Sequence, residues 1–120
     1  MREQPDGAQL LAIARDVLKQ KLLPLLAKDQ HYNALMIINA MSIAERQINY
    51  GQTPQHAERV VLCQLLGQDD ELADLNHAFA RAIRNGQMDD NDGAKRLLWQ
   101  ATVQRVRESA PKALTKFGVR

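Results

Sequence analysis

The sequence predicts an all-α fold: one domain, residues 1–120, in which about five helices form an antiparallel bundle around a buried second helix. A chain of 120 residues is a usual length for one domain. Aromatic residues make up only 4% of it, so the core must come mainly from aliphatic residues, alanine and methionine, which favour helices over sheets. No stretch alternates with a two-residue period, and the short connections between the expected helices favour antiparallel neighbours.

The first helix is expected to begin after Asp6, because Asp6 and Gln9 have the spacing of a capping box. Apolar residues then recur at helical spacing over residues 10–22. Pro24 lacks an amide hydrogen and disfavours the helical conformation of the residue before it. We therefore expect this helix to kink or end near Leu23.

The second helix, residues 32–50, is the expected centre of the bundle. Its first part is apolar on nearly all sides, a pattern typical of a buried helix, and Gly51 is suited to end it. Five residues of this helix are separated by steps of three or four and therefore lie on one face: Met36, Asn39, Ile43, Arg46 and Tyr50. Asn39 either bonds a neighbouring helix and fixes the packing, the interpretation we favour, or lines a cleft with Arg46 and Tyr50 for an anionic or amide-bearing group.

Three further helices are predicted from their start and stop signals. The first of them should start at Thr53-Pro54 and stop at Gly67. The second should start at Asp69 or Asp70 and stop at Asn85-Gly86, and the third should start at Asp92 or a neighbouring acid and stop at Pro111. The last of the three helices should span about residues 93–109. The basic segment from about residue 111 is expected to be a flexible tail.

Residues 86–93, GQMDDNDG, invite comparison with a calcium-binding loop. If Gly93 is aligned with the invariant sixth position of such a loop, Met88 falls at the first position and Trp99 at the twelfth, where oxygen ligands are required. The comparison therefore fails. We expect the acids to cap a helix and Met88 to hold the turn against the core.

No motif for catalysis, nucleotide binding or metal binding is present. The sequence lacks GxGxxG, P-loop, GxSxG and HExxH patterns, and His31, His56 and His77 have no second ligand at helical spacing. The apolar neighbours of Cys63 favour core packing over a nucleophile. We therefore expect no catalytic residue, no metal and no cofactor, and we rank a binding role above an enzyme while leaving an enzyme of unrecognised type open.

Charge is unevenly distributed along the chain. Residues 58–92 carry eight acidic and three basic side chains, whereas residues 93–120 carry one acidic and seven basic side chains. These are either solvated faces, which we prefer, or complementary patches for a charged partner or a homodimer. The basic residues Arg105, Arg107, Lys112, Lys116 and Arg120 lack interleaved aromatic residues and do not favour nucleic-acid binding.

The single cysteine suits a reducing compartment, and the N-terminal residues lack the apolar region of a signal peptide. The longest apolar run, residues 34–38, is too short to span a membrane. We therefore expect a cytoplasmic protein with no membrane association.

Three segments carry a resemblance to a known family: QPDGAQLLAIARDVL, YNALMIINAMSIAERQ and LNHAFARAIRNGQMDD. Together they resemble a family of small all-helical bacterial proteins classed as a domain of unknown function. In that family the genes often lie beside, or are fused to, aminoglycoside-phosphotransferase-like kinases and acyl-CoA dehydrogenases. Arg46, Arg84 and Gly86 stand at positions that look like the family pattern, whereas Ala110-Pro111 departs from its usual Asn-Pro.

The resemblance implies an accessory role near acyl-CoA metabolism and transfers no catalytic residue. Our leading hypothesis is a non-enzymatic interaction domain for the kinase-like or dehydrogenase-like protein. The alternative is a module that binds an acyl or CoA-like molecule between helices. The candidate ligand or partner face comprises Asn39, Arg46, Tyr50 and Arg84.

Overall fold

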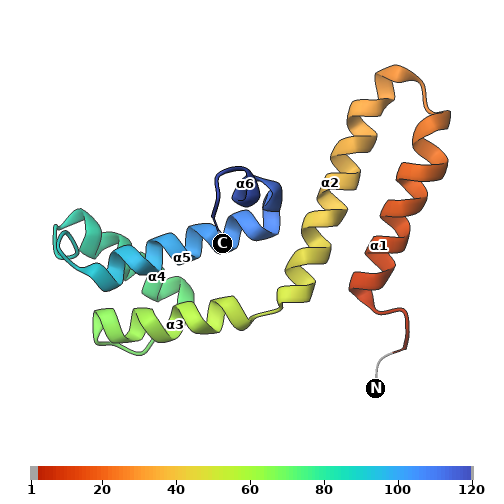
Figure 1. Cartoon of the computed structure of the whole chain (residues 1–120). Helices are drawn as coiled ribbons and strands as arrows, with labels where there is room; N and C mark the ends of the chain where they lie inside the picture. Colours follow the sequence, from red (N-terminus) through yellow and green to blue (C-terminus); the bar gives the residue numbers. More distant parts are fainter. Residues whose placement is uncertain (1–2, 120) are drawn as a thin grey trace. The chain divides into compact units, whose positions relative to one another are not determined.

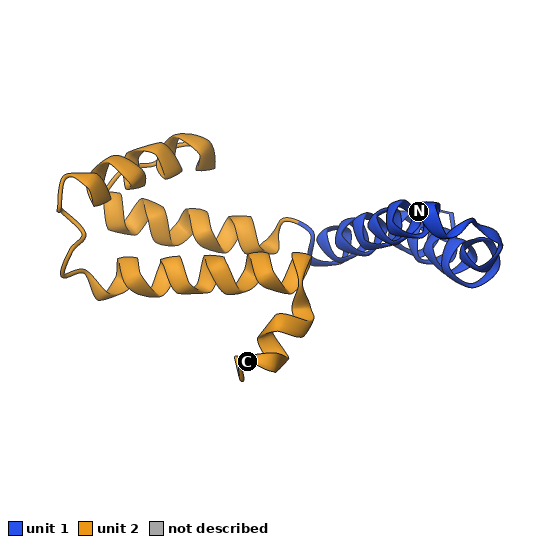
Figure 2. Cartoon of the chain, turned by 90° about the horizontal axis from the view of Figure 1, so that it is seen from above, with its two compact units in different colours: residues 1–51 blue, residues 52–120 orange. Residues whose placement is uncertain are grey.

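The computed structural model describes residues 3–119 and contains, in that range, six α-helices and no strand. The helices are α1 (Gly7–Val17), α2 (Lys28–Tyr50), α3 (Thr53–Leu66), α4 (Leu72–Arg84), α5 (Asp92–Ser109) and α6 (Pro111–Lys116) (Figure 1). The all-α prediction is confirmed. The chain divides into two compact units, residues 1–51 and residues 52–120 (Figure 2), so the expected single domain stays a prediction.

Unit 1 begins with the predicted capping box. The Asp6 carboxylate accepts a hydrogen bond from the Gln9 amide at 3.0 Å, and the Gln9 side-chain oxygen accepts one from the Asp6 amide at 2.8 Å. The first helix, expected to kink or end near Leu23, widens after Val17 into a π-helical turn, Leu18–Leu22, tightens into a 3₁₀ turn, Leu23–Leu25, and ends there. α2 begins at Lys28, four residues before the predicted start.

Within unit 1, α1 and α2 lie side by side and run in opposite directions (Figure 1). Ala8 and Ala34 are buried, and the Arg15 guanidinium forms an ion pair with the Glu45 carboxylate across the two helices. A hairpin of two helices covers only one side of each helix. The predicted burial of α2 on all sides is therefore not observed in this unit, and Tyr32 is 70% exposed.

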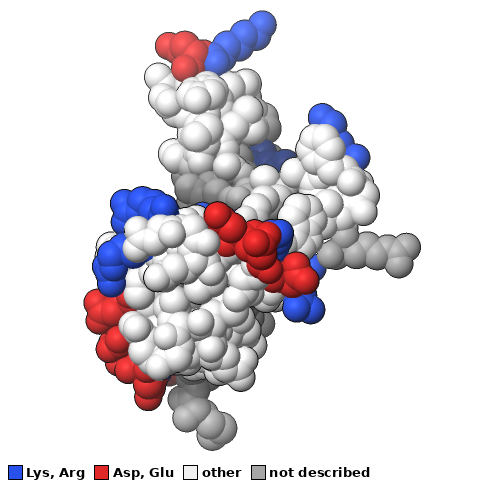
Figure 3. Space-filling model, turned by 90° about the vertical axis from the view of Figure 1, so that its left-hand side faces the viewer, with Lys and Arg blue, Asp and Glu red and all other residues white. Residues whose placement is uncertain are grey.

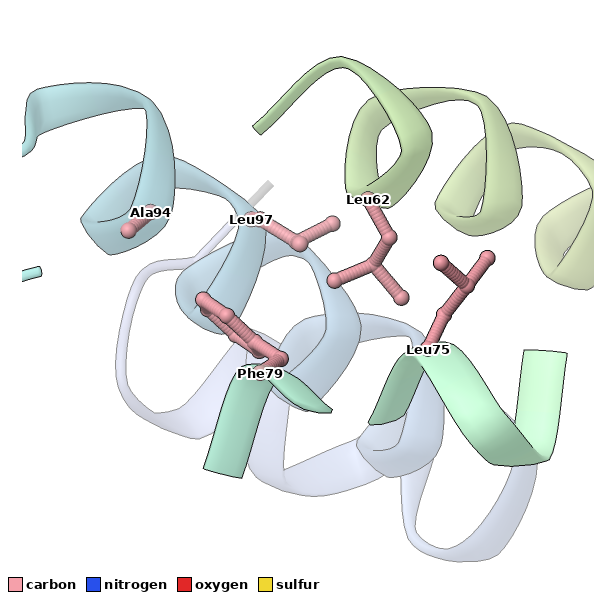
Figure 4. Close-up of a cluster of buried hydrophobic side chains, with 5 residues drawn as sticks. All are labelled: Leu62, Leu75, Phe79, Ala94 and Leu97. Atoms are coloured by element: carbon pink, nitrogen blue, oxygen red, sulfur yellow. The ribbon is translucent and has the colours of Figure 1, made fainter. Parts of the chain in front are cut away.

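Unit 2 encloses a hydrophobic core among three helices. α3 contributes Leu62, α4 contributes Leu75 and Phe79, and α5 contributes Ala94 and Leu97 (Figure 4). Leu62 and Leu75 are fully buried. Since apolar burial is the main favourable contribution to folding, this cluster explains why α3, α4 and α5 pack together.

The α4–α5 connection combines a glycine stop with an asparagine cap. Gly86 has φ = 78°, and the amides of Gly86 and Gln87 donate to the Ile83 and Ala82 carbonyls at 3.1 and 3.0 Å, the bonds of a Schellman motif. The cap of α5 is Asn91, not the predicted acid. Its side-chain oxygen accepts a hydrogen bond from the Ala94 amide at 2.9 Å. Met88 packs partly buried against the core, as predicted.

The α3–α4 connection is held by an arginine. Arg59 of α3 donates from its Nε to the Asp70 carbonyl at 2.9 Å and from Nη2 to the Asp69 carboxylate at 3.2 Å. The structure places Glu71 at the N-cap of α4. The prediction that Asp69 or Asp70 caps this helix is therefore wrong.

Two more helix boundaries differ from the predictions. α3 has Gln52 at its N-cap position and Thr53 inside the helix, without a side-chain capping bond. α6 lies in the segment predicted as a flexible tail, with Pro111 as its first residue. Arg120, at the end of that segment, lies outside the described residues.

Candidate interaction site

Unit 2 contains a groove with a volume of about 870 Å³. Most of its lining comes from α3 and α5, which pack against each other, and one residue comes from α4. The lining residues are Pro54, Gln55, Ala57, Glu58 and Val61 of α3, Asn76 of α4, and Leu97, Trp99, Gln100, Ala101, Val103, Gln104, Arg105, Arg107 and Glu108 of α5. Thus the site is built mainly on two regular helices.

The groove is lined by both apolar and polar side chains. Leu97 and Val103 are buried and Val61 is half-buried, so they supply a fixed apolar lining. Trp99, the only tryptophan of the chain, also lines the groove and is 60% exposed. An exposed tryptophan beside a hollow is well suited to bury its ring against a partner, since tryptophans are enriched among the residues that dominate interface energies.

Charges of both signs line the same groove. Glu58 is on α3 and Glu108 on α5, and Arg105 and Arg107 also come from α5. Gln104 donates from its side-chain amide to the Glu108 carboxylate at 3.1 Å, which helps to fix that carboxylate. A partner with charges of both signs would therefore fit this site better than a uniformly charged one.

Figure 3 shows acidic and basic groups, several of them next to one another, on the face that it views, with wide areas that carry neither. Charged groups on a surface can orient an approaching partner before contact is made.

The residues predicted as a ligand or partner face do not line this groove. Asn39 and Tyr50 are exposed and Arg46 is half-buried, and all three belong to α2 in unit 1. Asn39 was expected in a buried apolar wall, but no second helix of unit 1 covers that side of α2. Arg84 is exposed in the last turn of α4, in unit 2.

Sequence reasoning missed the groove because its two main walls are about 40 residues apart in the chain. The available signal was Trp99, the one tryptophan, on a helix with little hydrophobic periodicity. In the sequence, Trp99 stands out only as the twelfth position of the failed calcium-loop alignment.

The remaining candidate residues have ordinary structural environments. Cys63 is partly buried against the core, consistent with its predicted packing role. His56 and His77 are exposed, and a ring nitrogen of His31 lies 3.0 Å from the Leu26 carbonyl oxygen. Over residues 3–119, no group of three or more His, Cys, Asp or Glu residues could hold a metal ion.

A helix that spans a membrane must be both long and apolar. In the part of the chain that the structure describes, no helix combines the length and the apolar character needed to cross a bilayer.

The groove and α2 lie in the part of the chain for which a relationship to known proteins is found. No curated protein and no solved structure matches the chain. A family model does match residues 24–113, which include α2 to α5 and two of the three segments that carry the resemblance, but not the segment of residues 4–18. The chain belongs to the family described as a domain of unknown function, DUF6285.

Proposed function

We propose that this protein is a non-enzymatic accessory domain that binds a protein partner in the groove between α3 and α5. The observation that carries the proposal is Trp99, a large aromatic side chain that is 60% exposed where it lines the groove. Leaving it exposed forgoes the free energy that its burial would contribute, and a docked partner would recover it.

The partner element that fits best is an amphipathic helix. Its apolar side chains, spaced at three and four residues, would contact Val61, Leu97 and Val103, and its charged flanks would meet Glu58 and Arg105. Because the lining residues are held on regular helices, the groove needs little rearrangement before it binds. A preformed site loses less conformational entropy on association.

The family resemblance suggests the identity of the partner. We infer that it is an aminoglycoside-phosphotransferase-like kinase or an acyl-CoA dehydrogenase-like protein, and that the accessory role belongs to acyl-CoA metabolism in the bacterial cytoplasm. The chain would then stabilise or position this enzyme without contributing a catalytic residue.

The test uses the full chain and purified kinase-like and dehydrogenase-like proteins of the two kinds that the family resemblance suggests. Biolayer interferometry at low salt should detect binding to one of them, and Trp99→Ala should weaken it by about 30-fold or more, the effect of losing an interface residue worth about 2 kcal/mol. Leu98→Ala is the matched control: Leu98 is the neighbour on α5, is 46% exposed and does not line the groove. We expect it to change the affinity less than threefold.

Two results would overturn the proposal. One is the absence of binding to both proteins at low salt. The other is equal affinity of the Trp99→Ala and wild-type chains. Circular dichroism of each variant ensures that a change in affinity is not a loss of helix.

A second candidate function is the binding of an acyl or CoA-like molecule in the same groove. Its volume of about 870 Å³ lies within the range of about 300–1,000 Å³ usual for small-molecule sites. Its apolar lining would hold an acyl chain, and Arg105 and Arg107 would meet phosphate groups. Titration calorimetry with CoA and with a medium-chain acyl-CoA tests this function; no measurable heat with either at millimolar concentration would eliminate it.

A further inference from the structure

One face of α2 has the residue spacing of a helix that packs against another helix. Alternating steps of four and three residues relate Tyr32, Met36, Asn39, Ile43, Arg46 and Tyr50, which we call the α2 seam. α1 packs on the other side of α2, where Ala34 is buried and Glu45 pairs with Arg15. At 100° per residue the seam lies about half a turn around the helix from that contact.

The first half of the α2 seam is exposed and carries no formal charge. Tyr32 is 70% exposed and Met36 50%, and Asn39 is also exposed. No Asp, Glu, Lys or Arg occurs in residues 30–44. The outer face of a solvated helix ordinarily carries charged residues, so this face has the composition of a contact surface.

The charge pattern of the α2 seam indicates that the molecule packing against it is a second copy of the chain. A second copy of the chain brings the same side chains to the contact, so a face that carries net charge would repel itself. The seam from Tyr32 to Ile43 carries no charge and avoids that repulsion. Asn39 fits the same interpretation, because a polar residue in such a seam specifies the register and the number of helices that associate.

We propose that the α2 seam packs against the α2 seam of a second copy and forms a two-fold symmetric homodimer. This inference rests on unit 1 and is independent of the groove in unit 2.

The exposed area is sufficient for a modest interface. Tyr32, Met36 and Tyr50 of the α2 seam and Leu35 at its side are each between 40% and 70% exposed, and together they offer roughly 300–400 Å² of apolar surface per copy. Homodimer interfaces are about 65% apolar, so the full contact would bury roughly 1,000–1,200 Å² in total. This lies at the lower end for specific interfaces, and we therefore expect a dimer that dissociates on dilution.

Sedimentation equilibrium of the full chain tests the homodimer. Between about 1 µM and 1 mM, concentrations at which weak interfaces associate, the average mass should rise from 13.5 kDa toward twice that value. Met36→Glu would place two like charges in the α2 seam and should raise the dissociation constant at least tenfold. Ile37→Glu is the matched control, since Ile37 is the next residue of α2, has a similar exposure of 48% and lies off the seam; it should leave the constant within threefold.

Tyr32→Lys is the second seam variant. Tyr32 is largely exposed, so its replacement should leave the fold intact even if Met36→Glu loses helix in circular dichroism. It should also weaken the dimer at least tenfold. A mass of 13.5 kDa throughout the concentration range would overturn the proposal, as would a dimer that neither seam variant weakens. An equal effect of Ile37→Glu would also overturn it, because the association would then follow general apolar exposure.

Discussion

Replacement of Leu62 by alanine tests the packing of unit 2. Leu62 is fully buried in a cluster with Leu75, Phe79 and Leu97 (Figure 4), so its truncation removes buried methyl groups and leaves a cavity. Such replacements cost about 2.7–5 kcal/mol, depending on how far the surroundings relax. At about 0.05–0.15 kcal/mol per residue, a unit spanning residues 52–120 would have a free energy of unfolding of roughly 3–10 kcal/mol. The variant should thus lose a large part of this stability.

Urea denaturation followed by tryptophan fluorescence measures this loss directly. Trp99 is the one tryptophan of the chain and belongs to unit 2, so its emission follows the unfolding of that unit. With a denaturant slope of about 1–3 kcal/mol per molar urea, we expect the midpoint of Leu62→Ala to fall by roughly 1–5 M.

Val60→Ala is the control for the helix itself. Val60 lies two residues away on α3 and is 59% exposed, so its truncation should change the free energy of unfolding by less than about 0.5 kcal/mol. A loss below about 1 kcal/mol for Leu62→Ala, or similar losses for both variants, would refute the assignment of Leu62 to the core.

Two further predictions concern the α4–α5 connection. Asn91→Ala removes the 2.9 Å bond to the Ala94 amide and should cost about 1 kcal/mol in thermal unfolding, whereas Asn91→Asp keeps an acceptor and should recover most of that loss. Gly86→Ala forces a side chain into a backbone with φ = 78° and brings Cβ to 3.3 Å from an Asp89 carboxylate oxygen, so it should cost about 1–2 kcal/mol. Gly7→Ala, whose Cβ would meet nothing within 4 Å, should leave the melting temperature nearly unchanged, and an equal loss there would contradict the role of Gly86.

The helix boundaries could be predicted where the signal is local. Asp6 and Gln9 lie within one turn of each other, and their reciprocal bonds depend on no distant residue. Gly67 likewise ends α3 through its own positive φ of 66°. Pro111 shows the limit of such signals, because a proline that stops one helix can also be the first residue of the next.

Properties that depend on contacts between distant residues were not predictable in this way. The periodicity of α2 identifies apolar faces but not what covers them, and the same pattern is compatible with burial in one chain or against a second copy. The groove forms only because α3 and α5 pack against each other, and neither helix carries a sequence motif that predicts this packing. Thus the sequence indicated that Asn39 and Tyr50 lie on one face, yet it placed that face in a core that unit 1 does not form.

The two proposed surfaces have a joint consequence. The α2 seam and the groove lie on separate units, and both fall within residues 24–113, the part of the chain that matches the family. A homodimer through the seam would carry two copies of the groove. If the partner enzyme is itself oligomeric, the second groove binds at a high effective concentration, and the avidity exceeds the affinity of one site. Met36→Glu should then weaken binding to an oligomeric partner and leave each single contact intact, whereas Trp99→Ala weakens the contact itself. Under the proposed function, such an arrangement would let the chain stabilise an enzyme assembly through two modest interfaces.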